Sequence, residues 1–270
     1  MKIGVFDSGY GGLTILKEIR QRLPQYDYIY LGDNARNPYG NRSFEIVYEF
    51  TLQAVKALFE RECHLVILAC NTASAKALRS IQQNDLPKID PRKRVLGVIR
   101  PTVETLPDIS KNGHVGILAT PGTVKSKSYS LELLKYSPEM RITEHACPMW
   151  VPLVENNEFN SAGAEYFIKK DIDKILSKDP EIDTIVLGCT HYPLLADTIR
   201  KYLPEDIKLV CQGPLVAESL EDYLSRHPEI DNRLSKNSEI TYLTTEHTEK
   251  FDTLGSMFLG KPVVSDTIIL

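Results

Sequence analysis

Two segments of this chain share one layout, and they constrain its fold more than any other feature. Residues 65–72 and 184–191 each open with an apolar, β-branched run that ends in a cysteine, followed at once by a small polar residue. Such runs are typical of buried strands in parallel sheets. Cys70 and Cys189 would then stand at the carboxyl ends of strands, where open α/β sheets bind their ligands. We expect a helix after each cysteine, at residues 73–82 and 193–202, and further strands at 208–211 and 240–244.

A second pair of segments repeats as well. Residues 3–9 resemble residues 115–122, and aligning Gly4 with Gly116 gives an offset of 112 residues, against 119 for the two cysteines. Two similar offsets predict an internal duplication. We therefore expect an α/β fold: two similar doubly wound α/β domains with mostly parallel sheets, related by a pseudo-twofold axis, with the active site in the cleft between them.

The division into domains follows from the length of each half. Residues 1–98 would begin the first α/β domain and residues 210–270 would complete it. Residues 99–209 would form the second, because that stretch is long enough for one half alone.

Charge and hydropathy exclude several classes of function. The 270 residues carry a net charge of −4 with no basic stripe, so we expect no nucleic-acid partner. No apolar run approaches the roughly 20 residues of a membrane span, so we expect no membrane association. The chain opens on an apparent strand rather than on a signal peptide. These features predict a cytoplasmic protein.

The five cysteines predict free thiols, because an odd number in a reducing compartment does not suit a disulfide framework. Buried free cysteine is common, and we assign Cys63 and Cys211 to the core. Nothing next to Cys147 indicates chemistry.

Two other cysteine chemistries fit the sequence less well. Cys189-x-His191 and His145-x-Cys147 lack the spacing of structural zinc sites, so we expect no metal. A cysteine hydrolase could pair Cys189 with His191, but that mechanism leaves Cys70 without a role.

A two-base mechanism gives both thiols a role. If the halves face each other, one thiolate can take a proton from a carbon while the opposite thiol donates one to the other face, which inverts a stereocentre. A thiol pKa of about 8.5 suits either role, and a helix start lowers it further. Asp7 and His191 are natural partners for proton transfer to the two thiols. Polar residues at the two helix starts would bind a carboxylate, cap the helices, or do both: Asn71, Thr72 and Thr190.

Four motifs, taken together and in order, resemble the glutamate racemases of the aspartate/glutamate racemase superfamily. They are GVFDSGYGG at 4–12, GDNARNPYG at 32–40, ACNTAS at 69–74 and GCTHYPLL at 188–195. The resemblance covers most of the chain. It implies cofactor-independent interconversion of L- and D-glutamate by a homodimer, supplying D-glutamate for peptidoglycan.

The resemblance also implies roles for particular residues. Cys70 and Cys189 would be the two acid/base groups, assisted by Asp7, His191 and Glu155. The substrate would be lined by Asp7, Ser8, Pro38, Tyr39, Gly40, Asn71, Thr72, Thr190 and His191.

The sequence departs from the family pattern in several places. Asn34 and Asn37 stand where smaller or apolar residues are expected, and residues 156–157 and 211–213 also differ. These departures concern local geometry and dimer contacts rather than the chemistry. The chain starts directly at its first strand, so activation by a cell-wall precursor through an N-terminal extension is not expected.

Two alternatives stay open. An aspartate racemase, or another amino-acid racemase of the superfamily, would share the paired cysteines, although the motifs around Asp7 and Tyr39 favour glutamate. A protein that binds an amino acid without chemistry would need only the two halves and not the thiols.

Overall fold

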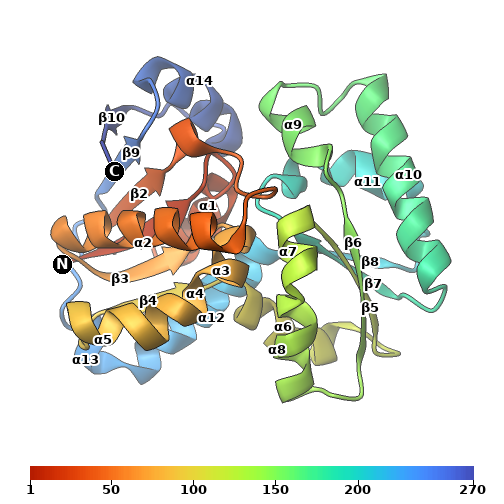
Figure 1. Ribbon diagram of the computed structural model, residues 1–270, viewed down its shortest axis with the longest axis horizontal. Helices are drawn as coiled ribbons and strands as arrows, with labels where there is room; N and C mark the ends of the chain where they lie inside the picture. Colours follow the sequence, from red (N-terminus) through yellow and green to blue (C-terminus); the bar gives the residue numbers. More distant parts are fainter.

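The computed structural model describes residues 1–270 and contains two parallel β-sheets, each with helices on both faces (Figure 1). The first sheet has six strands in the order β10-β9-β2-β1-β3-β4, and every neighbouring pair is parallel. Its strands are β1 (Lys2–Asp7), β2 (Tyr28–Gly32), β3 (Cys63–Leu68), β4 (Arg94–Gly97), β9 (Ile240–Thr244) and β10 (Ser265–Thr267).

The second sheet repeats the topology of the first. Its four parallel strands run in the order β6-β5-β7-β8, which matches β2-β1-β3-β4 strand for strand. They are β5 (His114–Ala119), β6 (Arg141–Ala146), β7 (Thr184–Gly188) and β8 (Lys208–Cys211). The predicted fold class, two similar α/β halves with parallel sheets, is confirmed.

Helices cover both faces of the first sheet because its strands are apolar on both sides. One face packs against α1 (Leu13–Arg22), α12 (Gln212–Arg226) and α14 (Thr248–Leu259). The other face packs against α2 (Phe44–Glu60) and the short helices that follow β3. These are α3 (Asn71–Lys76), α4 (Leu78–Ser80) and α5 (Leu86–Ile89), while α13 (Pro228–Asp231) follows α12.

The second sheet is covered in the same way. Its Val115 and Ile117 face α6 (Ile99–Ile109) and α8 (Ser128–Tyr136). The opposite face packs against α10 (Ala162–Lys178) and α11 (Ala196–Tyr202). Two short helices lie toward the first half, α7 (Pro121–Ser126) and α9 (Trp150–Glu155).

The duplication is visible in the packing of two glycines. A Cβ on Gly4 of β1 would lie 3.2 Å from Leu58 of α2 and 3.2 Å from Val66 of β3. A Cβ on Gly116 of β5 would lie 2.4 Å from Ile185 of β7. In both halves, therefore, glycine lets the central strand approach the neighbouring strand and a covering helix closely.

Some local predictions need correction. The helix expected at 73–82 is divided into α3, α4 and a π-helical turn at Ile81–Asp85. The helix expected at 193–202 begins as a 3₁₀ turn, Tyr192–Leu195, before α11.

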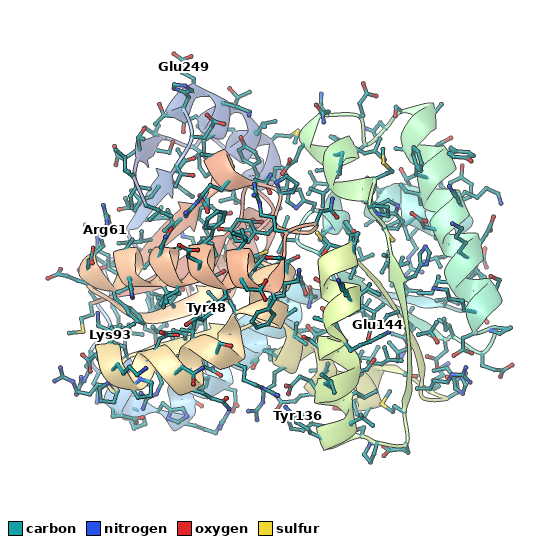
Figure 2. All side chains as sticks on the ribbon, viewed as in Figure 1. Tyr48, Arg61, Lys93, Tyr136, Glu144 and Glu249 are labelled. Carbon is teal, nitrogen blue, oxygen red and sulfur yellow. The ribbon has the colours of Figure 1, made fainter.

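Charged side chains such as Arg61 and Glu249 are exposed on the outside of the molecule (Figure 2). None of the helices is both long enough and apolar enough to cross a lipid bilayer. The division into 1–98 with 210–270 and 99–209 stays a prediction. The chain passes from the first sheet to the second between β4 and β5, and back between β8 and β9.

Candidate active site

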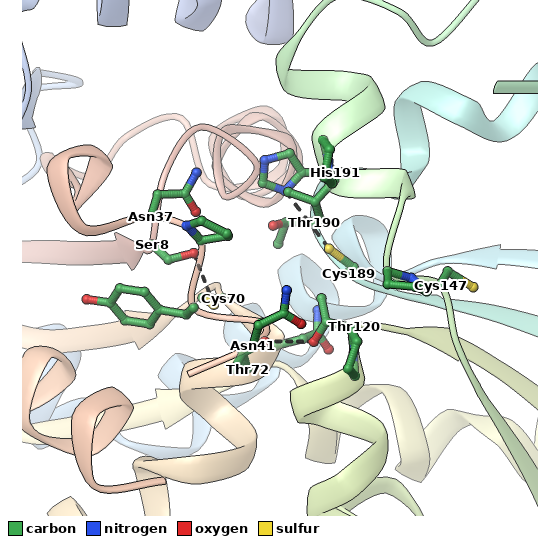
Figure 3. A pocket seen from close by; sticks show the side chains of 18 residues that line it. Ser8, Asn37, Asn41, Cys70, Thr72, Thr120, Cys147, Cys189, Thr190 and His191 are labelled. Carbon is green, nitrogen blue, oxygen red and sulfur yellow. Dashed lines mark hydrogen bonds between the residues drawn. The ribbon is translucent and has the colours of Figure 1, made fainter. Parts of the chain in front are cut away.

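The two repeated cysteines line one pocket between the sheets (Figure 3). Cys70 follows β3 and caps α3, while Cys189 follows β7 and precedes the 3₁₀ turn at Tyr192–Leu195. Each is only 6% exposed. The structure thus brings together two thiols that are far apart in the sequence.

Most residues predicted to line the substrate do line this pocket. Beside the cysteines they are Ser8, Pro38, Tyr39, Gly40, Asn71, Thr72, Thr190 and His191. Two predicted residues, Asp7 and Glu155, lie behind the lining. The pocket is completed by residues that were not predicted: Asn37, Asn41, Thr120, Pro121, Cys147, Pro148, Val151 and Pro152.

Cys70 has only neutral hydrogen-bond partners. Its thiol donates to Ser8 Oγ at 3.5 Å, and the Ala73 N–H donates to its sulfur at 3.4 Å. Burial, together with the nearby Asp7 carboxylate, raises the pKa of Cys70 to about 12. This thiol is therefore protonated at neutral pH.

Cys189 faces a chain of charged groups. Its sulfur lies 3.9 Å from His191 Nδ1, and His191 Nε2 lies 2.9 Å from Glu155 Oε1. Burial lowers the pKa of His191, but Cys189 and Glu155 outweigh it and raise that pKa to about 10. Burial likewise raises the pKa of Glu155, yet hydrogen bonds from His191 and Asn37 bring it below its ordinary value. The raised pKa keeps His191 as an imidazolium, held between the Cys189 sulfur and the Glu155 carboxylate.

Asp7 is fully buried near both Cys70 and His191, and burial raises its pKa. Its carboxylate accepts hydrogen bonds from the Gly9 N–H at 2.9 Å and from Thr190 Oγ1 at 3.3 Å. No hydrogen bond joins Asp7 to Cys70, which bonds Ser8 instead. Asp7 therefore acts on Cys70 through space and braces the opposite half through Thr190.

Direct hydrogen bonds hold the two halves together around the pocket. Thr72 and Thr120 hydroxyls are 2.9 Å apart, and the Gly122 N–H donates to the Gly40 carbonyl at 2.7 Å. The cavity left between them is about 50 Å³, below the usual size of a ligand pocket. The two halves are thus in direct contact beside the pocket.

One glycine makes this close approach possible. A Cβ on Gly11 would lie 2.3 Å from Thr190 Oγ1 and 2.5 Å from His191 Nδ1. Any side chain at this position would displace both residues from their partners.

Two lining residues have side chains that already hydrogen-bond to other residues of the protein. The Asn71 amide donates to Gln212 at 2.7 Å and accepts from the Tyr129 hydroxyl at 2.7 Å. The Tyr39 hydroxyl donates to Asp33. Asn71 and Tyr39 can therefore offer a ligand mainly their backbone groups.

One cluster of metal-ligating residue types lies next to the pocket. His145 Nε2 lies 3.0 Å from Asp171 Oδ1, and the Cys147 sulfur lies nearby, with its pKa well above the ordinary value because of burial. Lys178 Nζ lies 3.2 Å from His145 Nδ1. A lysine ammonium can only donate there, so Nε2 carries the proton and donates to Asp171. This arrangement suits a hydrogen-bonded support for β6 better than a metal site.

One of the lining residues that the sequence analysis missed could have been found from the internal repeat. Alignment of Gly4 with Gly116 also aligns Ser8 with Thr120, so the repeat itself points to Thr120. Asn37 was noticed only as a departure from a pattern, and its partner Glu155 is 118 positions away.

Comparisons with known proteins identify the family of this chain. A family model described as Asp/Glu/Hydantoin racemase matches residues 12–219. A glutamate racemase from Ruegeria sp. (strain TM1040) is 39% identical, with 97% of this chain and 98% of the relative covered. One from Geobacter metallireducens is 38% identical, covering 96% of this chain and 92% of the relative.

Solved structures give the same result. Glutamate racemase isoform RacE1 from Bacillus anthracis has a TM-score of 0.90 at 33% identity, covering 100% of this chain and 97% of that one. The Francisella tularensis glutamate racemase, solved with D-glutamate, has a TM-score of 0.86 at 34% identity, with 100% and 97% covered. The resemblance predicted from the motifs is confirmed, and this chain is a racemase that belongs to the Asp/Glu/hydantoin racemase family.

Proposed function

We propose that this racemase interconverts L- and D-glutamate by a two-base mechanism in which Cys70 and Cys189 are the acid/base residues. The observation that supports it most directly is the pair of buried thiols at equivalent strand ends of the two halves, lining one pocket. A binding protein has no need of either thiol. A cysteine hydrolase needs only the one beside His191.

The two thiols suit opposite roles at rest. Cys189, beside the His191 imidazolium, is the thiolate that removes the α-proton from one face of the substrate. Cys70 is protonated and donates its proton to the opposite face of the resulting carbanion. The product then has inverted configuration, Cys189 is a thiol and Cys70 a thiolate, and the reverse reaction runs from that state.

The walls of the pocket offer hydroxyl, amide and backbone N–H groups that can hold carboxylates. Among the lining residues there is no lysine, arginine, aspartate or glutamate. Carboxylates would therefore be held by hydroxyls, amides and backbone N–H groups. We assign the α-carboxylate to the starts of the segments after each cysteine, at Asn71, Thr72 and Thr190.

The remaining substrate groups go to the other predicted residues. Asp7 and Ser8 lie toward the ammonium, His191 acts through Cys189, and the loop Pro38, Tyr39 and Gly40 receives the side-chain carboxylate. Glu155 acts on His191 and does not touch the substrate. The names of the relatives and the D-glutamate complex of the Francisella enzyme support glutamate as the substrate.

We also propose, from the family resemblance, that the reaction needs no cofactor and that its D-glutamate serves peptidoglycan synthesis. The same resemblance supports a homodimer acting in the cytoplasm.

Racemisation in heavy water tests the proposal. The protein is incubated with L-glutamate and no added cofactor, while optical rotation and α-deuterium uptake are followed. Deuterated D-glutamate should appear, and should vanish in Cys70→Ala and in Cys189→Ala. If only L-aspartate racemises, the architecture stands and the substrate is wrong. If neither amino acid changes while either still binds, the protein is a binding protein.

A further inference from the structure

Asn37 reaches across the cleft to the chain of hydrogen-bonded side chains behind Cys189, which consists of His191 and Glu155. It lies in the loop after β2, in the first half, and its Nδ2 donates to Glu155 Oε1 at 2.5 Å. The same Glu155 oxygen lies 2.9 Å from His191 Nε2. Because a carboxylate can only accept, the Asn37 amide must present its NH₂ to Glu155. Figure 3 shows Asn37 across the pocket from Cys189, with His191 near it.

We propose that Asn37 is a positioning residue that holds Glu155 in line with His191 from the opposite half, so that the chain behind Cys189 is complete only when the cleft is closed. This inference rests on the proposed function for its catalytic consequence. Glu155 is on α9 in the second half, and Asn37 is its only hydrogen-bond partner from the first half.

The loop that carries Asn37 is firmly supported. Arg36, on one side, donates to Asp33 at 2.7 Å and to Gln53 at 2.6 Å. Tyr39, on the other side, donates to the same Asp33, which is fully buried. Asn37 is thus held on a support belonging to the first half, and separation of the halves must break its bond to Glu155.

Other charged and titratable groups face the chain from the elements around it. Asp7 lies near His191 from β1, and Tyr10 lies near Glu155 from the glycine-rich turn, with Glu246 beyond it. Lys250 of α14 acts on Glu155 from the outside. None of these groups hydrogen-bonds Glu155, whose side-chain partners are Asn37 and His191. Loss of the Asn37 donor therefore leaves Glu155 oriented by His191 alone.

Asn37→Leu removes the donor at similar size, and Asn37→Asp keeps the shape but sets a carboxyl against Glu155. We expect Asn37→Leu to lower kcat about tenfold, the worth of one hydrogen bond to a charged group. The effect should nearly disappear in a Glu155→Gln background. If the two losses multiply instead, Asn37 acts directly on the substrate and the inference is wrong.

The pH dependence separates the two variants. At low pH the introduced carboxyl of Asn37→Asp can be protonated and can then donate a hydrogen bond to Glu155. The loss of kcat in this variant should therefore shrink as the pH falls. The deficit of Asn37→Leu should not shrink. Equal deficits at all pH values would overturn the inference. Asn156→Ala is the matched control, because Asn156 is exposed at the end of α9 and bonds only the Pro152 carbonyl.

A readout independent of turnover keeps this inference separate from the proposed function. The NMR titration of the His191 ring should move to lower pH in Asn37→Leu and stay unchanged in Asn156→Ala. An unchanged His191 midpoint in Asn37→Leu would contradict the positioning role even if glutamate racemises. If the His191 midpoint shifts in Asn37→Leu but the protein does not racemise glutamate, the coupling between Asn37 and His191 holds and glutamate is not the substrate.

Discussion

Cys70 and Cys189 occupy equivalent places in a duplicated fold, yet their surroundings differ. Cys70 has a serine hydroxyl and a backbone N–H as partners, whereas Cys189 has an imidazolium backed by a carboxylate. The difference begins at one position of the repeat. The residue two places after the cysteine is Thr72 in the first half and His191 in the second.

This comparison separates two tasks that the site must perform. The duplication places a thiol on each side of the pocket, which is what inversion at a carbon requires. The unequal neighbours place different charges around the two thiols, which suits the proposed division into one acid and one base. The duplication therefore accounts for the positions of the two thiols, and the residues that differ between the halves account for their different surroundings.

The largest expected effect is the loss of either thiol. General acid/base groups contribute about 10²–10⁴-fold, so Cys70→Ala and Cys189→Ala should each lower kcat by a factor in that range. Binding of glutamate should be retained in both, as measured by calorimetry. Substantial racemisation in either variant would show that one thiol alone can serve both faces.

Removing the carboxylate behind His191 should have the next largest effect. Glu155→Gln should lower kcat about 10–100-fold, because a buried imidazolium loses its counter-charge. The pKa of His191 is raised from 6.5 to about 10, so the wild-type alkaline limb should lie near that pH. In Glu155→Gln the pH profile of kcat/KM should show this limb at lower pH. A limb that stays in place would assign it to another group.

The same raised pKa has a consequence for stability. A cationic His191 stabilises the fold fully below about pH 6.5, and this contribution is lost as the pH rises through about 10. The stability difference between wild type and Glu155→Gln, measured by urea unfolding, should therefore shrink as the pH approaches 10.

Alkylation compares the two thiols directly. At neutral pH, iodoacetamide should modify Cys189 before Cys70, since burial and Asp7 raise the pKa of Cys70 to about 12. Ser8→Ala removes a hydroxyl that can donate to the Cys70 thiolate once it forms and so lowers this pKa. The variant should slow Cys70 further and reduce kcat about tenfold. Peptide mass spectrometry gives the order. Faster modification of Cys70 would reverse the assignment of acid and base.

The fold was largely predictable because most strands are continuous apolar runs. The stretches at 208–211 and 240–244 were identified at their observed bounds, as β8 and β9. β6 gave no such signal, because it is an edge strand that carries Arg141, Glu144 and His145. Edge strands need not be apolar on both faces, so a search for continuous apolar runs does not find them.

The site was predictable only where it lies on the repeat or in a motif. The two cysteines mark strand ends, which topology brings together. The bond between Asn37 and Glu155 joins a loop to a short helix across the cleft. No periodicity links such positions, and their contact follows from the way the two halves close.

The smallest expected effect concerns Thr120, the counterpart of Ser8 in the repeat. Its hydroxyl caps α7 and bonds Thr72 at 2.9 Å across the cleft, whereas Ser8 bonds the thiol of Cys70. Thr120→Val keeps the shape and removes these bonds, at a cost of about 1 kcal/mol in stability. Because Thr120 touches no thiol, KM should rise a fewfold while kcat hardly changes, opposite to Ser8→Ala. Steady-state kinetics on both variants gives the split, and a fall in kcat alone for Thr120→Val would mean that the two positions act alike despite their different partners.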